Sequence, residues 1–160
     1  GFTLGSEQST TSGTTITFSS IPAGTKMIVV NLSGVSVSGT DSIRLQLGDA
    51  GGLEVAGYKT GGHETVTATS SGFSSGSSFI LVKVGVAAEA YSGSVVLSLA
   101  NSATFQWAAA FGIGSNGNSV NYGASGGGHK ALSAELTQLA ILSTGTDTFD
   151  AGAVNIAYIS

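Results

Sequence analysis

The chain has 160 residues, 25 glycines, one proline and no cysteine, and charged residues make up only 9% of it. This length suits a single domain, and the lack of cysteine excludes disulfides and thiolate metal sites. The net charge of −4 and the scattered basic residues give no footprint for a nucleic-acid backbone. No apolar run approaches the ~20 residues of a transmembrane helix, so neither nucleic acid nor membrane insertion is expected.

The first segment, residues 1–13, is rich in Ser, Thr and Gly and has neither a basic start nor an apolar core. We interpret it as an arm or linker, followed by a single domain over residues 14–160. Thr14–Ile21 alternates apolar and polar residues and predicts a strand, and Pro22-Ala23-Gly24 predicts the turn that follows.

Met27–Tyr58 has the clearest pattern and predicts three strands joined by turns at Gly39-Thr40-Asp41 and Asp49-Ala50-Gly51. With these turns, Val35, Leu45 and Val55 would lie side by side and Leu47 would face Leu53. The apolar parity changes at Ser33-Gly34. A β-bulge there is favoured, and the alternative is that Met27–Leu32 is covered on both faces.

The middle of the chain alternates between weak and strong patterns. Lys59–Ser78 predicts a short strand near Thr65–Thr69 within an exposed loop. Phe79–Val86 is apolar at both parities, as expected for a strand in the middle of a sheet with both faces covered. After a turn at Glu89–Gly93, a hairpin turning at Asn101-Ser102 would pair Leu99 with Phe105 and Leu97 with Trp107, forming the aromatic half of the core.

The last third begins with Gly112–Lys130, which predicts a long low-complexity loop. Ala131–Ser143 fits a helix and a strand equally well. Thr148–Ser160 returns to alternation and predicts a closing strand inside a sheet. Eight or nine strands in one domain predict an all-β fold, an antiparallel two-layer β-sandwich that is jelly-roll-like, with a barrel as the second choice.

Residues suited to catalysis are few. His63 and His129 are more simply solvated loop histidines, and they could hold zinc only if the fold brought them together with a carboxylate. Asp147 and Asp150 favour turn formation over a calcium loop. No phosphate-binding glycine motif and no nucleophile elbow occurs. The sequence therefore predicts a non-enzymatic protein without cofactors or metals.

Binding is the remaining role, since β-sandwiches that bind sugars use exposed aromatic rings and short polar side chains in loops. The aromatic residues nearest the predicted turns are Tyr58, Phe73, Tyr91 and Tyr122. Each of them is equally compatible with a place in the core or in an interface.

Two segments carry a family resemblance, Ser12–Tyr58 and Ser143–Ser160. The matching motifs are Ile21-Pro22, Gly34-Val35-Ser36, Gly39-Thr40, Leu47-Gly48, Gly51-Gly52, Glu54, Gly57-Tyr58, and Gly145–Gly152 with Asn155. In this pattern the chain resembles the C-terminal β-sandwich of bacteriophage tail fibres and tail-spike-like proteins. The resemblance also favours a strand within Ala131–Ser143.

The resemblance implies a homotrimeric virion component that binds a host-surface glycan or an outer-membrane receptor. We expect the contact surface in the loops Gly61–Gly72 and Gly114–His129, with these candidate receptor-binding residues: His63, Phe73, Asn118, Tyr122 and His129. One alternative is a capsid decoration or cement protein with a sticky arm at residues 1–13. A glycan hydrolase is the third hypothesis, and it would need a close carboxylate pair, for which the local groupings are Glu54, Glu64, Asp147 and Asp150.

Overall fold

The computed structural model describes residues 1–160, and all of its regular structure is β. Its fourteen strands have these bounds: β1 Thr3–Leu4, β2 Gln8–Ser9, β3 Thr15–Phe18, β4 Met27–Val37, β5 Ile43–Asp49, β6 Gly52–Leu53, β7 Tyr58–Val66, β8 Thr69–Ser75, β9 Phe79–Val82, β10 Tyr91–Asn101, β11 Gln106–Ser115, β12 Tyr122–Ala131, β13 Gln138–Ser143 and β14 Phe149–Ile159. The structure contains no helix that could span a membrane.

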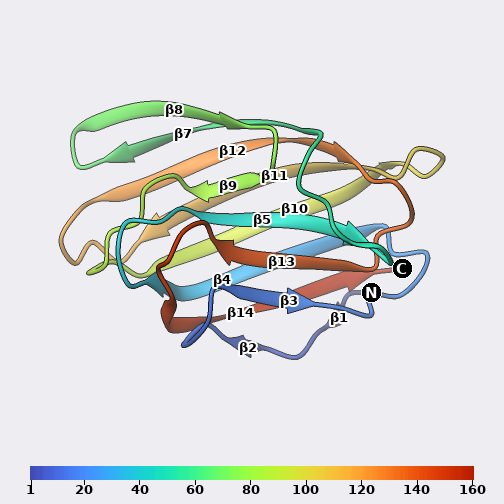
Figure 1. Cartoon of the computed structure of the whole chain (residues 1–160), viewed down its shortest axis with the longest axis horizontal. Helices are drawn as coiled ribbons and strands as arrows, with labels where there is room; N and C mark the ends of the chain where they lie inside the picture. Colours follow the sequence, from blue (N-terminus) through green and yellow to red (C-terminus); the bar gives the residue numbers. More distant parts are fainter.

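The strands form two antiparallel sheets that pack face to face (Figure 1). The nine-stranded sheet has the order β1-β14-β4-β10-β11-β12-β7-β8, with β2 also paired to β14. The five-stranded sheet has the order β3-β13-β5-β6, with β9 also paired to β5. The predicted all-β, two-layer antiparallel sandwich is therefore confirmed.

The core lies between the sheets and contains 31 buried hydrophobic residues. On β4 the buried positions change from even (Ile28, Val30, Leu32) to odd (Val35, Val37). Leu32 pairs with Gly93 and Val35 with Tyr91, so β4 has one extra residue at this point, where Gly34 has a φ of 64°. The predicted β-bulge at Ser33-Gly34 is confirmed.

The expected hairpin at Gly39-Thr40-Asp41 is wrong, because β4 and β5 belong to different sheets. The segment between them crosses from one layer to the other, and a crossing turn uses the same residue types as a hairpin. The second turn does form a hairpin, but Leu53 pairs with Gly48 instead of Leu47. Val55 lies outside this pairing and is exposed.

The two glycine-rich segments are strands, so the loops predicted at Lys59–Ser78 and Gly112–Lys130 are wrong. They supply β7, β8, the end of β11 and β12, and residues 67–68, 76–78 and 116–121 remain as connections. The turn at 67–68 interrupts the short strand predicted near Thr65–Thr69. The glycines lie beneath aromatic rings. A Cβ on Gly62 would be 2.5 Å from Cε2 of Phe73, and one on Gly126 would be 2.6 Å from Cζ of Phe111. The strand count therefore exceeds the expected eight or nine.

The hairpin of β10 and β11 forms with a different register. Leu99 pairs with Trp107 and Leu97 with Ala109, because residues 102–105 are all used in the turn. All four residues of β9 are buried, as expected, yet β9 pairs only with β5 and is an edge strand. The last ambiguous segment contains strand β13, and β14 lies inside the large sheet as predicted.

The segment predicted as an arm lies along the edge of the sandwich. Leu4 pairs with Ala157, and Gln8 pairs with Val154, so β1 and β2 extend the large sheet beyond β14. The hydroxyl of Thr10 donates to the carbonyl of Ala151 at 2.7 Å. These bonds fix residues 3–10 against the domain.

Candidate functional site

The structure does not gather the five predicted contact residues into one loop cluster. His63 and His129 are exposed on the outer faces of β7 and β12, and Asn118 is exposed in the 116–121 loop. Phe73 is half-buried on the inner face of β8, and Tyr122 is buried between the sheets. His63, Asn118 and His129 are therefore accessible to a receptor, and Tyr122 is not.

Tyr122 is buried, and its hydroxyl donates a hydrogen bond to a carboxylate inside the core. It donates to Oε2 of Glu64 at 2.8 Å, and the Tyr122 ring packs edge-on against Tyr91 at 5.2 Å between centroids. Burial, together with the neighbouring Glu64, raises the pKa of Tyr122, so this hydroxyl keeps its proton. Glu64, which the sequence left open as part of a carboxylate pair, is thus held inside the core.

Asn118 belongs to a loop that a buried carboxylate orders. Glu89 accepts hydrogen bonds from the backbone N–H groups of Asn118, Ser119 and Val120. Desolvation opposes its ionisation, but these donors outweigh it and lower the pKa of Glu89 to about 2. The amide of Asn118 also donates to the carbonyl of Ala88 at 3.0 Å. The loop therefore presents a defined surface.

A second polar network joins the two sheets at the opposite end. Lys130 is buried, and its Nζ lies 2.6 Å from Oε1 of Glu54 and 5.4 Å from the centre of the Tyr58 ring. Desolvation raises the pKa of Glu54, but hydrogen bonds from Lys130 and Ser133 outweigh it and lower that pKa to about 2. Burial raises the pKa of Tyr58 to about 12. This network is structural, because its members bond to each other.

The residues considered for metal binding are not gathered into one site. His129 pairs with Lys59, which is four residues from His63 on β7, so the histidines are roughly 13 Å apart at strand spacing. They are too far apart to share a zinc ion. The carboxylates of Asp41 and Asp147 each accept the other's backbone N–H at 2.8 Å, so Asp147 links two turns 106 residues apart instead of bonding its own turn as expected. No group of three or more potential ligands could hold a metal ion.

The outer face of the large sheet has one apolar end. Strand register places Leu4, Ala157, Val29, Val96 and Ala110 in one row across β1, β14, β4, β10 and β11. The neighbouring row contains Ile159, Met27 and Ala108, with the polar Ser98 between Met27 and Ala108, and Phe2 lies two residues before Leu4. Phe2, Leu4 and Val96 are 52%, 69% and 39% exposed. We call the nine apolar residues of this group the apolar end.

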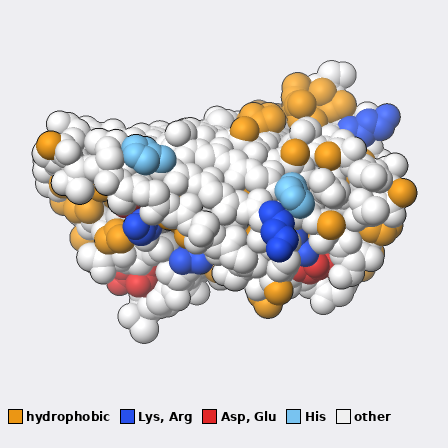
Figure 2. All heavy atoms as spheres, turned by 90° about the horizontal axis from the view of Figure 1, so that it is seen from above, with side chains coloured by type: hydrophobic (Ala, Val, Ile, Leu, Met, Phe, Trp, Pro, Cys, Tyr) orange, Lys and Arg blue, Asp and Glu red, His pale blue; other side chains and the backbone are white.

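The same face changes character over β12, β7 and β8, and we call this part the bare region. Its outward positions are almost all small, with a few larger polar groups: Gly123, Ser125, Gly127, His129, Lys59, Gly61, His63, Thr65, Ser70, Gly72 and Ser74. Figure 2 shows a broad surface with little colour, on which the two histidines lie well apart and hydrophobic atoms gather at one margin. Backbone and hydroxyl groups dominate what a ligand would meet here.

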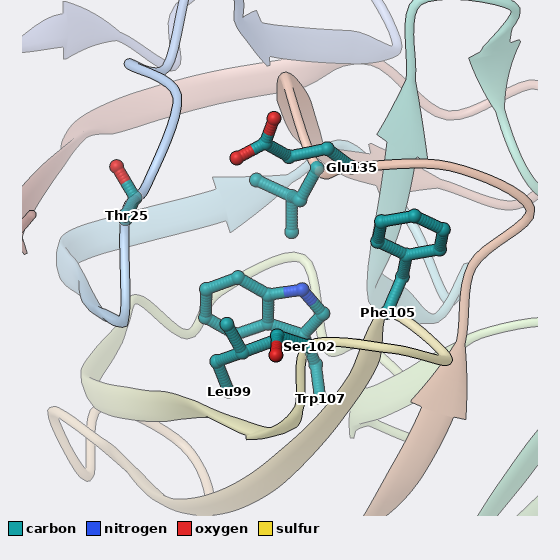
Figure 3. Close-up of a pocket in the computed structure, with 7 residues that line it drawn as sticks. Thr25, Leu99, Ser102, Phe105, Trp107 and Glu135 are labelled. Atoms are coloured by element: carbon teal, nitrogen blue, oxygen red, sulfur yellow. The ribbon is translucent and has the colours of Figure 1, made fainter.

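Two concave features complete the surface. A groove of about 410 Å³ lies between the N-terminal segment, β3 and β14, and it contains no charged residue. A smaller hollow of about 60 Å³ lies beside Trp107, with Phe105, Leu99 and Glu135 around it (Figure 3). Neither feature was predicted from the sequence. Trp107 was expected in the core, but the hollow forms only where three turns meet in space.

No family model, no curated protein and no solved structure matches the chain.

Proposed function

We propose that the chain is a receptor-binding domain of a bacteriophage tail fibre, located in the virion. In this role it binds a host-surface glycan or outer-membrane receptor without catalysis and assembles as a homotrimer. Two observations support this proposal: the resemblance in the sequence, and the chemical character of the exposed face of the large sheet.

The segments that carry the resemblance lie far apart in the sequence but interlock in the structure. The backbone N–H of Asp41, beside the Gly39-Thr40 motif, donates to the carboxylate of Asp147 in the closing motif, and the N–H of Asp147 donates to the carboxylate of Asp41, both at 2.8 Å. Gly39 and Gly145 leave room for these carboxylates, since a Cβ would lie 2.6 Å from Asp147 Oδ1 or 2.4 Å from Asp41 Oδ1. The motif residues therefore stabilise the fold, and we expect the receptor to bind at other surfaces.

The observation that carries the proposal is the division of the outer face of the large sheet. The apolar end is a contiguous patch of the kind that protein partners cover, and a second and third copy of the chain would remove it from water. The bare region has exposed hydroxyls, backbone groups and the side chains of Lys59, His63 and His129. Such a surface suits a polar receptor such as a glycan.

A glycan array with the purified domain tests the receptor role. We expect specific glycans to bind, and the triple variant Lys59→Ala/His63→Ala/His129→Ala to lose that binding while its melting temperature stays unchanged. Thr15→Ala, an exposed position on the small sheet, is the matched control and should bind normally. Absence of binding to glycans and to outer-membrane preparations would contradict the proposal, and released reducing ends would indicate a hydrolase.

A capsid decoration or cement protein is the second candidate. The exposure of Phe2 and Leu4 favours it, because a sticky N-terminal segment is what such a protein needs for attachment. It predicts binding to capsids and none to glycans. Phe2→Ser/Leu4→Ser would abolish capsid binding under this hypothesis, while a tail-fibre domain would show no capsid binding in the first place.

A further inference from the structure

The hollow beside Trp107 lies where three turns converge. The β3–β4 turn contributes Thr25, the β10–β11 turn contributes Ser102 and Phe105, and the β12–β13 connection contributes Glu135. In Figure 3 the indole ring lies between Phe105 on one side and Leu99 and Ser102 on the other, and Glu135 lies beyond the indole on the side away from Ser102. The hollow therefore has an aromatic wall and a polar rim.

The indole N–H of Trp107 has no partner within the protein. The residue is only 2% exposed, and no hydrogen bond involves its Nε1. This atom keeps some contact with solvent, since Arg44 Nε is the one fully buried side-chain nitrogen or oxygen without a partner. Because Trp107 lines the hollow, an acceptor placed there is the natural partner of this donor.

The rim also holds unused acceptors. Oε1 of Glu135 accepts the backbone N–H of Gly24 at 2.7 Å, and Oε2 accepts no hydrogen bond. The Ser102 hydroxyl is likewise unpaired and exposed. Phe105 has a φ of 52°, a left-handed conformation that is unfavourable for an aromatic residue. Its carbonyl accepts the N–H of Leu132 at 3.1 Å, which helps to fix the ring against the hollow.

We infer that the hollow binds an acetamido group, as carried by N-acetylated amino sugars. The carbonyl would accept from the indole N–H, the amide N–H would donate to Oε2 of Glu135 or to Ser102, and the methyl group would pack on Phe105. A volume of about 60 Å³ holds roughly four water-sized positions, and an acetamido group has about that many heavy atoms. The inference depends on the proposed function only for the source of the ligand, a host glycan.

The single tryptophan of the chain gives a direct probe, because a ¹⁵N-labelled domain has one indole N–H signal in its NMR spectrum. We expect N-acetylglucosamine to shift this signal in a saturable titration, and glucose and glucosamine to leave it in place. A parallel titration with Nε-acetyl-lysine tests the other possible source of an acetamido group, an acetylated protein. A stronger shift with Nε-acetyl-lysine than with N-acetylglucosamine would support the acetamido chemistry while assigning its source to an acetylated protein.

Two variants test the location. Ser102→Met places a longer side chain at the rim and should weaken N-acetylglucosamine binding at least ~10-fold. Thr104→Met, an exposed position of the same turn that does not line the hollow, is its control. Trp107→Phe keeps a ring but removes the donor and should weaken binding similarly in a sample that still melts cooperatively.

Three results would overturn the inference. They are the absence of any shift with N-acetylglucosamine, a stronger response to glucosamine, which would indicate a cation site, and unchanged binding by Ser102→Met. If N-acetylglucosamine does not bind in the hollow, glycans on the array can still bind through the bare region. If the variant without Lys59, His63 and His129 loses array binding, its indole titration should stay unchanged. The two proposals can therefore be contradicted independently.

Discussion

The apolar end and the bare region share one sheet and one core but differ entirely on their outer face. Beneath the apolar end, Ile28 and Val30 fill the interior, while Val29 between them faces outward. Beneath the bare region, Phe111 and Phe73 fill the interior over Gly126 and Gly62. This difference shows that packing in the core restricts the size of inward-facing residues, whereas outward-facing residues can vary and so determine what the face binds.

The largest effect should come from the inner side of the bare region. In Gly126→Ala the new Cβ would lie 2.5 Å from the carbonyl oxygen of Gly61 and 2.6 Å from Phe111 Cζ. We expect it to lower the free energy of unfolding by about 3 kcal/mol, as overpacking does. Gly123→Ala, on the same strand with nothing within 4 Å, should change it by less than about 0.5 kcal/mol. Equal effects in urea unfolding would contradict the inward–outward distinction.

The buried carboxylate beneath the same strands gives the next effect. Tyr122→Phe removes the donor that serves Oε2 of Glu64 and leaves this acceptor buried. We expect a loss of about 2 kcal/mol in the free energy of unfolding, measured in urea. The double variant Tyr122→Phe/Glu64→Leu should recover part of the loss. A single variant as stable as the parent protein would mean that the bond contributes nothing.

Acid should weaken both ends of the sandwich through Glu54 and Glu89. Their pKa values of about 2 lie below the ordinary 4.5, so each favours the folded state above pH 4.5. This contribution is lost as the pH falls from 4.5 towards 2. The double variant Glu54→Gln/Glu89→Gln should melt at a lower temperature than the parent protein at pH 7. Its melting temperature should fall less than that of the parent protein when the pH is lowered.

The control for the acid experiment is Glu7→Gln in the N-terminal segment, where the carboxylate accepts no hydrogen bond. It should follow the parent profile of melting temperature against pH. An unchanged profile in the double variant would show that other groups cause the acid response.

The smallest effect on stability is expected on the outer face of the bare region. Lys59→Ala/His63→Ala/His129→Ala removes exposed side chains, so the free energy of unfolding should change by less than about 0.5 kcal/mol. A loss above 2 kcal/mol in urea would show that these side chains support the fold, and the contrast between the two faces would disappear.

The sequence predicted the fold wherever side chains alternated. The bulge at Gly34 was predictable because the apolar parity changes there while both flanking runs stay periodic. The strands β7 and β12 were not, because Gly61, Gly62 and Gly126–Gly128 replace the side chains that would reveal a period of two. After Tyr122, the inner residues Ala124 and Gly126 alternate with the outer residues Gly123 and Ser125, and both series are small.

Contacts between distant turns were beyond prediction for a different reason. The Gly39–Asp41 turn has hairpin composition, and only the strand pairing, with β4 and β5 in different sheets, shows that it crosses between them. Its bond to Asp147 joins residues more than a hundred positions apart. Among the candidate receptor-binding residues, His63, Asn118 and His129 are exposed, whereas Tyr122 is buried because its hydroxyl bonds to Glu64 on another strand. The hollow at Trp107 could not be predicted either, because it forms only where three turns that are distant in the sequence meet.

The most direct test of the account is the mass of the domain in solution, measured over a range of concentrations for the parent protein and for Leu4→Ser/Val96→Ser. Both side chains are exposed in the single chain, so their replacement should leave the fold intact. If the apolar end is buried between copies, the parent protein will be a trimer and the variant a monomer with an unchanged melting temperature. A parent protein that remains a monomer at every concentration would contradict the proposed assembly.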